Sequence, residues 1–230
     1  MADIKTKEEL RTLYTEDYVS RFEKFEKSQT ARIKGILKHI KFSKEDVVGD
    51  FACGNGILSR LIHQRVSACF GVDFSKEFIE IARESSKNRG ISNVSFIEAD
   101  IIAYSKDNTD FFDKICTLDF SEHIYDAEFI SIYSAIYTAL KKDGQLYLHT
   151  PNGDFIVEIL KDLGIMEQFP EHIAVRNSQD YIKLLTGIGF RNMEVKFIPH
   201  YNILKYLHFF SLLPFIGKFF KARILISCSR

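Results

Sequence analysis

The chain lacks an excess of charge of either sign, because 31 Lys and Arg residues are matched by 31 Asp and Glu residues. A protein dedicated to nucleic acid usually carries a basic excess, so we expect no nucleic-acid partner. Long apolar runs are also missing: the most apolar stretch, residues 202–220, is interrupted by Lys205, His208, Pro214 and Lys218. None reaches the roughly 18–20 apolar residues of a transmembrane helix, which argues against a membrane-spanning protein.

Cysteine is scarce, and its spacing is not that of a metal site. The four cysteines are Cys53, Cys69, Cys116 and Cys228, with no CxxC pair among them. We therefore expect reduced thiols rather than disulfides or structural zinc, as in a cytoplasmic protein. The polar segment 1–7, which shows no signal peptide, agrees with a cytoplasmic location. The length of 230 residues suits one domain, 1–230, with a large core.

Predicted strands and helices alternate along most of the chain. Apolar patterning predicts strands at 46–51, 67–72, 94–98, 112–118, 145–149, 190–198 and 223–227. It predicts helices at 7–40 (in two segments, the second over 28–39), 57–65, 75–89, 126–142 and 177–189. Alternation of this kind predicts an α/β fold with a mostly parallel sheet and helices on both faces. The last two predicted strands would form an antiparallel hairpin at its end.

The most informative motif is the glycine loop that runs from Asp50 to Ser59, between the first predicted strand and the next helix. Gly54 and Gly56 allow a tight turn and a close approach of the backbone to a ligand. Ligands of open α/β sheets bind at the carboxyl ends of the strands, where this loop lies. A purely structural turn is the alternative interpretation.

Two acidic residues follow the second and third predicted strands. Asp73 stands where a carboxylate could accept both hydroxyls of a ribose, and Asp100 where one could accept the exocyclic amine of adenine. Each acid alone could instead be the N-cap of the following helix. Together with the glycine loop, they indicate a nucleoside-containing cofactor.

At these residues the sequence resembles the class I S-adenosylmethionine-dependent methyltransferases, over roughly residues 30–230. That family carries an acid and a glycine-rich loop after strand one, a ribose-binding acid after strand two and an adenine-binding acid after strand three. Ala52 departs from the family, which commonly has glycine there. The resemblance implies a Rossmann-like sheet of seven strands with a C-terminal antiparallel hairpin strand, and a helical lid over residues 1–40. It implies that S-adenosyl-L-methionine is held by Asp50, Ala52, Cys53, Gly54, Gly56, Asp73, Phe74, Asp100, Ile101, Asp119 and, from the lid, Tyr14 and Tyr18.

The rival cofactor is NAD, which the same kind of loop can bind. A dinucleotide fingerprint would place glycine at position 59, where this chain has Ser59. Asp100 also has no natural role in binding NAD. The sequence therefore favours a methyltransferase over a dehydrogenase.

Candidate acceptor-site residues follow the fourth and fifth predicted strands. If a helical turn starts at Asp119, then Asp119, Glu122 and His123 share one face. With His172 they could hold a divalent cation such as Mg²⁺, which would lower the pKa of an acceptor hydroxyl. A capping box at Asp119 and Glu122 is the alternative, with His123 packed in the fold. His149 is a further candidate catalytic residue or a core histidine.

This pattern resembles metal-using O-methyltransferases, of which one group acts on ubiquinone precursors and another on RNA 3′-terminal 2′-hydroxyls. Both groups usually have glutamate where this chain has Asp119, which weakens the inference of a metal. The resemblance to the ubiquinone type implies O-methylation of a small, lipophilic hydroxylated molecule. N- or C-methylation, and a non-catalytic module that binds S-adenosylmethionine, are the alternatives.

The apolar segment over residues 200–221 is predicted to be an insertion between the last two strands. It would form a helix with a narrow polar stripe, followed by a second short helix that starts at Pro214. Its Phe and Leu side chains must be covered by something. The alternatives are packing against the sheet or the partner of a homodimer, and a cap that holds a lipophilic acceptor or rests on a membrane surface.

Overall fold

A seven-stranded sheet forms the centre of the molecule, in a computed structural model that describes residues 26–230. The strand order is β3-β2-β1-β4-β5-β7-β6. The strands are β1 Val47–Phe51, β2 Ala68–Asp73, β3 Val94–Glu98, β4 Phe112–Leu118, β5 Leu140–Pro151, β6 Arg191–Ile198 and β7 Arg223–Ser229. β7 runs antiparallel to β5 and β6, and the other neighbouring strands pair in parallel. The predicted mostly parallel sheet with an antiparallel C-terminal strand is confirmed.

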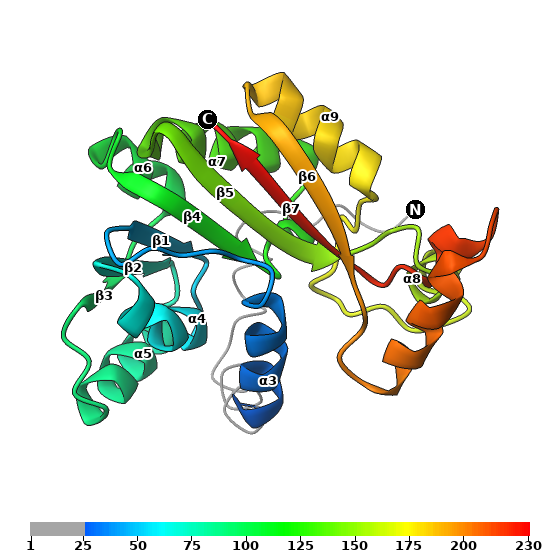
Figure 1. The fold of residues 1–230 in the computed structure, drawn as a ribbon, viewed down its shortest axis with the longest axis horizontal. Helices are drawn as coiled ribbons and strands as arrows, with labels where there is room; N and C mark the ends of the chain where they lie inside the picture. Colours follow the sequence, from blue (N-terminus) through cyan, green and yellow to red (C-terminus); the bar gives the residue numbers. More distant parts are fainter. Residues whose placement is uncertain (1–25) are drawn as a thin grey trace.

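Helices cover both faces of this sheet (Figure 1). The α-helices are α3 Glu26–Ile36, α4 Ile57–Ile62, α5 Lys76–Asn88, α6 Ile101–Asp107, α7 Asp126–Ala139, α8 Ile156–Asp162 and α9 Ser178–Ile188. Short 3₁₀ helices are η1 His63–Arg65, η2 Ser121–His123, η3 Ile203–Leu212 and η4 Gly217–Phe220. No helix in the described part of the chain is long and apolar enough to cross a membrane.

The core lies in two layers, one on each face of the sheet. Phe112 and Ile115 of β4 pack with Tyr133 and Ile136 of α7 on the face that α6, α7 and α9 cover. On the other face, Ile36 of α3 packs with residues of α4 and with β1 and β2. These layers hold the carboxyl ends of the strands in fixed positions.

Local sequence explains where the helices begin. In α5, Phe78, Ile79 and Ala82 recur on one buried face, and the Ser75 hydroxyl accepts the Phe78 N–H at the N-terminus. Asn177 and Asp180 form a capping box at the start of α9. These signals lie in the sequence, and both helices occur where they were predicted.

The predicted helix over 126–142 is wrong at its end. α7 ends at Ala139, because Leu140 adopts an extended conformation and pairs with Phe112 of β4. The 202–220 segment forms a helix and a second short helix after Pro214, as predicted, but both are 3₁₀ helices, η3 and η4, rather than α-helices. The segment carrying Tyr14 and Tyr18, part of the predicted lid, lies outside the described residues.

Candidate functional site

The glycine loop joins β1 to α4 at the carboxyl end of the sheet. Gly54 and Gly56 both have positive φ angles, 50° and 73°. A Cβ at Gly54 would meet no heavy atom of residues 26–230 within 4 Å, and Gly54 lines a cavity. A Cβ at Gly56 would collide with the ring of Phe96, and Gly56 does not line that cavity. The two glycines therefore serve different purposes, close approach to a ligand at Gly54 and packing at Gly56.

This difference predicts that one of two matched substitutions mainly destabilises the fold and the other mainly weakens ligand binding. Gly56→Ala combines left-handed backbone strain with overpacking and is expected to destabilise the fold by about 2–4 kcal/mol. Gly54→Ala carries only the backbone strain, about 1 kcal/mol, and should mainly weaken ligand binding. Urea unfolding measures both, and equal unfolding midpoints for the two variants would refute the assignment.

Ala52 also adopts a left-handed conformation, with φ of 58°. This conformation is nearly strain-free for glycine and strained for alanine, which gives a physical reason for the glycine common in the resembled family. Ala52 lines the cavity beside Cys53.

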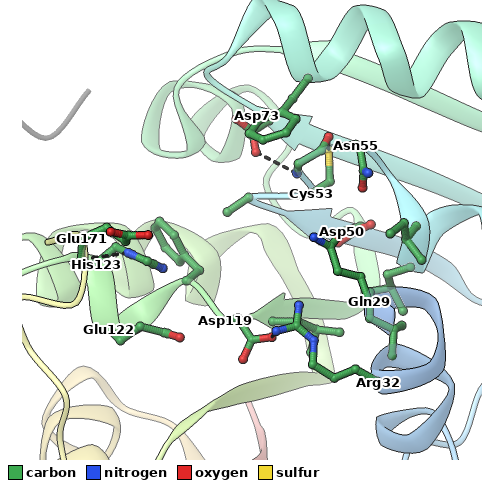
Figure 2. Close-up of a pocket in the computed structure, with 18 of the residues that line it drawn as sticks. Gln29, Arg32, Asp50, Cys53, Asn55, Asp73, Asp119, Glu122, His123 and Glu171 are labelled. Carbon is green, nitrogen blue, oxygen red and sulfur yellow. Dashed lines mark hydrogen bonds and ion pairs between the residues drawn. The ribbon is translucent and has the colours of Figure 1, made fainter. Parts of the chain in front are cut away.

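Asp73 is the last residue of β2, and its carboxylate is held by the glycine loop. The Gly54 N–H donates to Oδ2 at 2.9 Å, and the Ser75 N–H donates to Oδ1 at 2.9 Å. Burial raises the pKa of Asp73, although these two backbone hydrogen bonds oppose the shift. Figure 2 shows the carboxylate at the edge of the cavity, beside Cys53. Each carboxylate oxygen has a second lone pair, so both can still accept a hydroxyl.

Asp50 lies deeper in the same region and holds the start of α4. Its Oδ2 accepts the Ser59 hydroxyl at 2.6 Å and the Ser59 N–H at 3.1 Å. Burial raises the pKa of Asp50 to about 7. Ser59, the residue that weakened the NAD interpretation, is thus a fully buried partner of Asp50.

Asp100 is the N-cap of α6. Its Oδ1 accepts the N–H groups of Ile102 and Ala103 at 2.9 and 3.3 Å. Neither Asp100 nor Ile101 lines the cavity. The capping interpretation therefore describes the geometry of Asp100, and its contact with adenine remains a prediction.

The cavity has a volume of about 310 Å³ and joins the cofactor candidates to the acceptor candidates. Of the predicted site residues it brings together Asp50, Ala52, Cys53, Gly54, Asp73, Phe74, Asp119, Glu122, His123 and His172, and leaves out Gly56, Asp100, Ile101 and His149. Gln29, Arg32, Phe169, Glu171, Tyr201 and Arg223 also line it and were not predicted. They come from α3, the loop after α8, the residue before the 202–220 segment and the first residue of β7, and periodicity alone does not place these near β1.

The helical turn predicted to start at Asp119 is wrong. Asp119 has a φ of 53°, and the 3₁₀ turn η2 begins at Ser121 with no side-chain cap. The same observation removes the alternative interpretation, a capping box at Asp119 and Glu122. Glu122 and His123 therefore do not share a helix face with Asp119.

Asp119 is instead the centre of a buried ion cluster. Its Oδ2 lies 2.9 Å from Arg32 Nη1, and its Oδ1 accepts hydrogen bonds from Arg223 and, at 3.0 Å, from His149 Nδ1. Burial alone would raise the pKa of Asp119, but the charges of Arg223 and Arg32 hold it well below its usual range. The ring of Tyr201 covers both guanidiniums at 5.2 and 5.3 Å. Because each oxygen of this carboxylate forms an ion pair with a guanidinium, Asp119 is a poor metal ligand.

His149 is a partner of this cluster rather than a group facing the cavity. It is 1% exposed and hydrogen-bonded to Asp119. Burial lowers the pKa of His149 despite the nearby carboxylate, so the ring is neutral near pH 7. The core interpretation of His149 therefore agrees with its placement.

Glu122, His123 and His172 lie together at the other side of the cavity. One ligand atom from each falls within 4.8 Å of the others, in the described part of the chain. His123 Nδ1 lies 2.8 Å from the Glu171 carbonyl, and the dashed line in Figure 2 marks this contact. A carbonyl only accepts, so Nδ1 carries the proton and the lone pair of the neutral ring sits on Nε2.

The two neighbours of His123 differ in their proton affinity. Burial raises the pKa of Glu122, although His123 acts in the opposite direction, and the Thr150 hydroxyl donates to its carboxylate at 3.1 Å. Burial, and then the charge of His123, lowers the pKa of His172 to about 3. His172 is therefore neutral near pH 7 and too weak a base to take a proton there.

Comparison with known proteins adds independent information. A family model described as a methyltransferase domain matches residues 42–195. The chain is similar to a ubiquinone biosynthesis O-methyltransferase of Azotobacter vinelandii, with 24% identity over 169 residues that cover 74% of this chain and 70% of the relative.

Solved structures share the fold. The structure resembles a SAM dependent methyltransferase from Archaeoglobus fulgidus, with a TM-score of 0.67, 18% identity and coverage of 93% of this chain and 99% of that chain. It also resembles a geranyl diphosphate C-methyltransferase from Streptomyces coelicolor, with a TM-score of 0.63, 14% identity and coverage of 87% and 76%. At these identities the likeness describes the fold, and the acceptor has to be argued from the site.

Proposed function

Since the chain belongs to the methyltransferase domain family and is an S-adenosylmethionine-dependent methyltransferase, we propose that it methylates a hydroxyl oxygen of a small molecule. The observation that carries the proposal is the Glu122–His123–His172 cluster, which lines the same cavity as Gly54 and Asp73. A hydroxyl must lose its proton as it is methylated, and this cluster offers a base to take it.

The cavity fits S-adenosylmethionine by the chemistry of its walls. Asp73 can accept the ribose hydroxyls, the open face of Gly54 admits close approach, and Arg32 can bind the carboxylate of the amino-acid part. When bound, the cofactor supplies an electrophilic methyl group. The chain's own task is to align the acceptor with that methyl group and to remove the acceptor's proton.

His123 is the base that the geometry favours. Its Nδ1–H donates to the Glu171 carbonyl, which fixes the ring and leaves the lone pair on Nε2. The buried carboxylate of Glu122 stabilises the imidazolium that forms when His123 takes the proton. His172 and His149, the other two histidines predicted from sequence, are less suited because burial lowers the pKa of each.

The acceptor atom is tested by following the methyl carbon. The protein is incubated with ¹³C-methyl-labelled S-adenosylmethionine and a panel of phenols, catechols, amines and enolisable ketones, and the product is examined by NMR. The proposal predicts label on oxygen. Label on nitrogen or carbon would favour the N- or C-methyltransferase alternative, and cofactor binding without turnover of any acceptor would favour a non-catalytic module.

A divalent cation is the other chemistry open to this cluster. Glu122, His123 and His172 would hold the ion, which would polarise the acceptor hydroxyl. Two imidazoles and one carboxylate suit a transition metal better than Mg²⁺, and Asp119 is not available to the set.

A chelator separates the two chemistries. With His123 as a metal-free base, kcat is expected to remain unchanged after exhaustive dialysis against a chelator. A loss of turnover that added Mn²⁺, Zn²⁺ or Mg²⁺ restores would contradict the metal-free base and assign the cluster to a metal. Calorimetric binding of S-adenosylmethionine before and after dialysis provides the control for damage to the cofactor site.

A further inference from the structure

The segment 202–220, here called the apolar insertion, exposes a concentration of large apolar side chains. Phe215 is 96% exposed and Leu212 is 83% exposed. The other large apolar residues of the insertion that are exposed are Ile203, Tyr206, Phe209, Phe210, Leu213 and Ile216. Exposed apolar patches on soluble proteins mark interaction sites, so this surface calls for a partner.

The insertion packs on itself rather than on the sheet. Of the residues of η3 none is buried, and the main contacts of η3 are with η4. The ring of Phe210 contacts the rings of Phe209 and Phe220 within the insertion. Figure 1 shows the orange and red coils of η3 and η4 at the periphery, away from the sheet. The alternative of ordinary packing against the sheet is therefore wrong for this segment.

The tip of the insertion holds its most exposed side chain in a costly conformation. Phe215 has a φ of 65°, a region that glycine occupies freely and that bulky residues rarely adopt. Its side chain is nevertheless almost fully in water. Exposing an apolar ring to water is unfavourable, and a binding partner that covers the ring of Phe215 would remove this cost.

Charge identifies the kind of partner. No acidic residue follows Glu194 in the sequence, so the apolar insertion carries Lys205 and Lys218 and no carboxylate of its own. Lys221 follows directly, with its ammonium 4.4 Å from the ring of Phe197. Although the chain as a whole is neutral, these lysines make the insertion locally basic. Apolar rings among lysines complement a surface that has an apolar interior and anionic headgroups.

A second copy of the chain fits this face less well. A symmetric dimer would place the same patch against itself, and therefore lysine against lysine. The insertion also lacks carboxylates that could pair with those lysines across such an interface.

The base of the insertion is fixed at the wall of the cavity. Tyr201 and Arg223, which flank the insertion, both line the cavity. The Asn152 side chain donates to the Lys221 carbonyl at 2.7 Å, which ties the end of the insertion to the residue after β5. A surface bound by the insertion would therefore lie close to the candidate acceptor site.

We propose that the apolar insertion docks the protein on anionic lipid membranes, with Phe209, Leu212 and Phe215 among the acyl chains and Lys205 and Lys218 at the headgroups. The docking itself does not depend on the reaction. Its consequence, that the cavity would receive a lipophilic acceptor from the bilayer, rests on the proposed function.

The test is co-sedimentation with vesicles of phosphatidylcholine, with and without phosphatidylglycerol. The wild type is expected to sediment with the anionic vesicles and much less with pure phosphatidylcholine. The triple variant Phe209→Ser, Leu212→Ser, Phe215→Ser should lose about tenfold or more of this binding. Lys205→Glu with Lys218→Glu should remove the preference for anionic lipid.

Controls separate docking from folding and from catalysis. Ile130→Ser, on the exposed face of α7, removes an apolar side chain elsewhere and should leave vesicle binding unchanged. Each variant should keep the wild-type unfolding midpoint and calorimetric affinity for S-adenosylmethionine. A wild type that stays in the supernatant would overturn the proposal, and so would light scattering that shows a dimer which the triple variant dissociates. Vesicle binding without methyl transfer would leave docking intact and refute only the proposed function.

Discussion

Replacing His123 by alanine is expected to lower kcat by about 10²–10⁴-fold, the usual contribution of a positioned general base. The calorimetric affinity for S-adenosylmethionine should change little, because the cofactor residues Gly54 and Asp73 come from other elements. The expected loss follows from the tautomer of His123, which the Glu171 carbonyl fixes with the lone pair on Nε2. Steady-state and single-turnover kinetics measure the effect.

The matched control is His172→Asn, in the neighbouring ring of the same cluster. The centroids of the two rings lie 5.2 Å apart, yet burial lowers the pKa of His172 to about 3. His172 therefore cannot serve as the base near neutral pH, and we expect its variant to lose less than about tenfold in kcat. A larger loss at His172 than at His123 would reverse the assignment.

The second large effect is the loss of stability that we expect when Asp119 is replaced. Replacing it by asparagine leaves the guanidiniums of Arg32 and Arg223 without their shared carboxylate, and Arg223 is 5% exposed. Breaking a buried ion pair by removing one partner costs about 3–5 kcal/mol, so we expect a loss of this size in the free energy of unfolding. Chemical denaturation at pH 7 measures it.

The pH dependence of this loss has a definite sign. The pKa of Asp119 lies well below its usual range because of Arg223 and Arg32. Its stabilising contribution is therefore complete above the unfolded-state pKa of about 3.9 and is lost as the pH falls through the folded-state pKa. The gap between wild type and variant should be full at pH 7 and shrink only below about pH 4.

Asp73→Asn is the control for Asp119, as another buried carboxylate on the same cavity. The backbone N–H groups of Gly54 and Ser75 donate to different oxygens of Asp73, so asparagine keeps one of these hydrogen bonds and turns an NH₂ group toward the other donor. We expect it to cost about 1–3 kcal/mol of stability, less than Asp119→Asn, in addition to weakening cofactor binding. Equal stability losses for the two variants would contradict the central role of the Asp119 ion cluster.

The sheet could be predicted because each strand is a short apolar run bounded by turn residues. The strands 94–98 and 112–118 occur at their predicted bounds. The helices α6 and α8 were missed, since seven residues give less than two complete periods of a helical pattern. The apolar spacing of the 202–220 segment predicts helical structure, but none of the residues of the 3₁₀ helix η3 is buried.

The part of the candidate site that follows directly after strands could be predicted from the sequence. Gly54 and Asp73 follow strands directly, and the carboxyl ends of parallel strands meet at one edge of the sheet. Arg223 is distant in sequence and reaches the site only because β7 inserts between β5 and β6. Asp119 does not start a helical turn because its φ angle is positive, and the spacing of residues in the sequence does not reveal such an angle.

Cofactor binding tests the account most directly, because every assigned role depends on which molecule the cavity holds. Isothermal titration calorimetry with S-adenosylmethionine, its demethylated product and NADH should show binding of the first two only. Asp73→Ala should weaken that binding by about 1–3 kcal/mol through the lost hydrogen bonds to the ribose. Binding of NADH in place of S-adenosylmethionine, or an unchanged affinity in Asp73→Ala, would contradict the account.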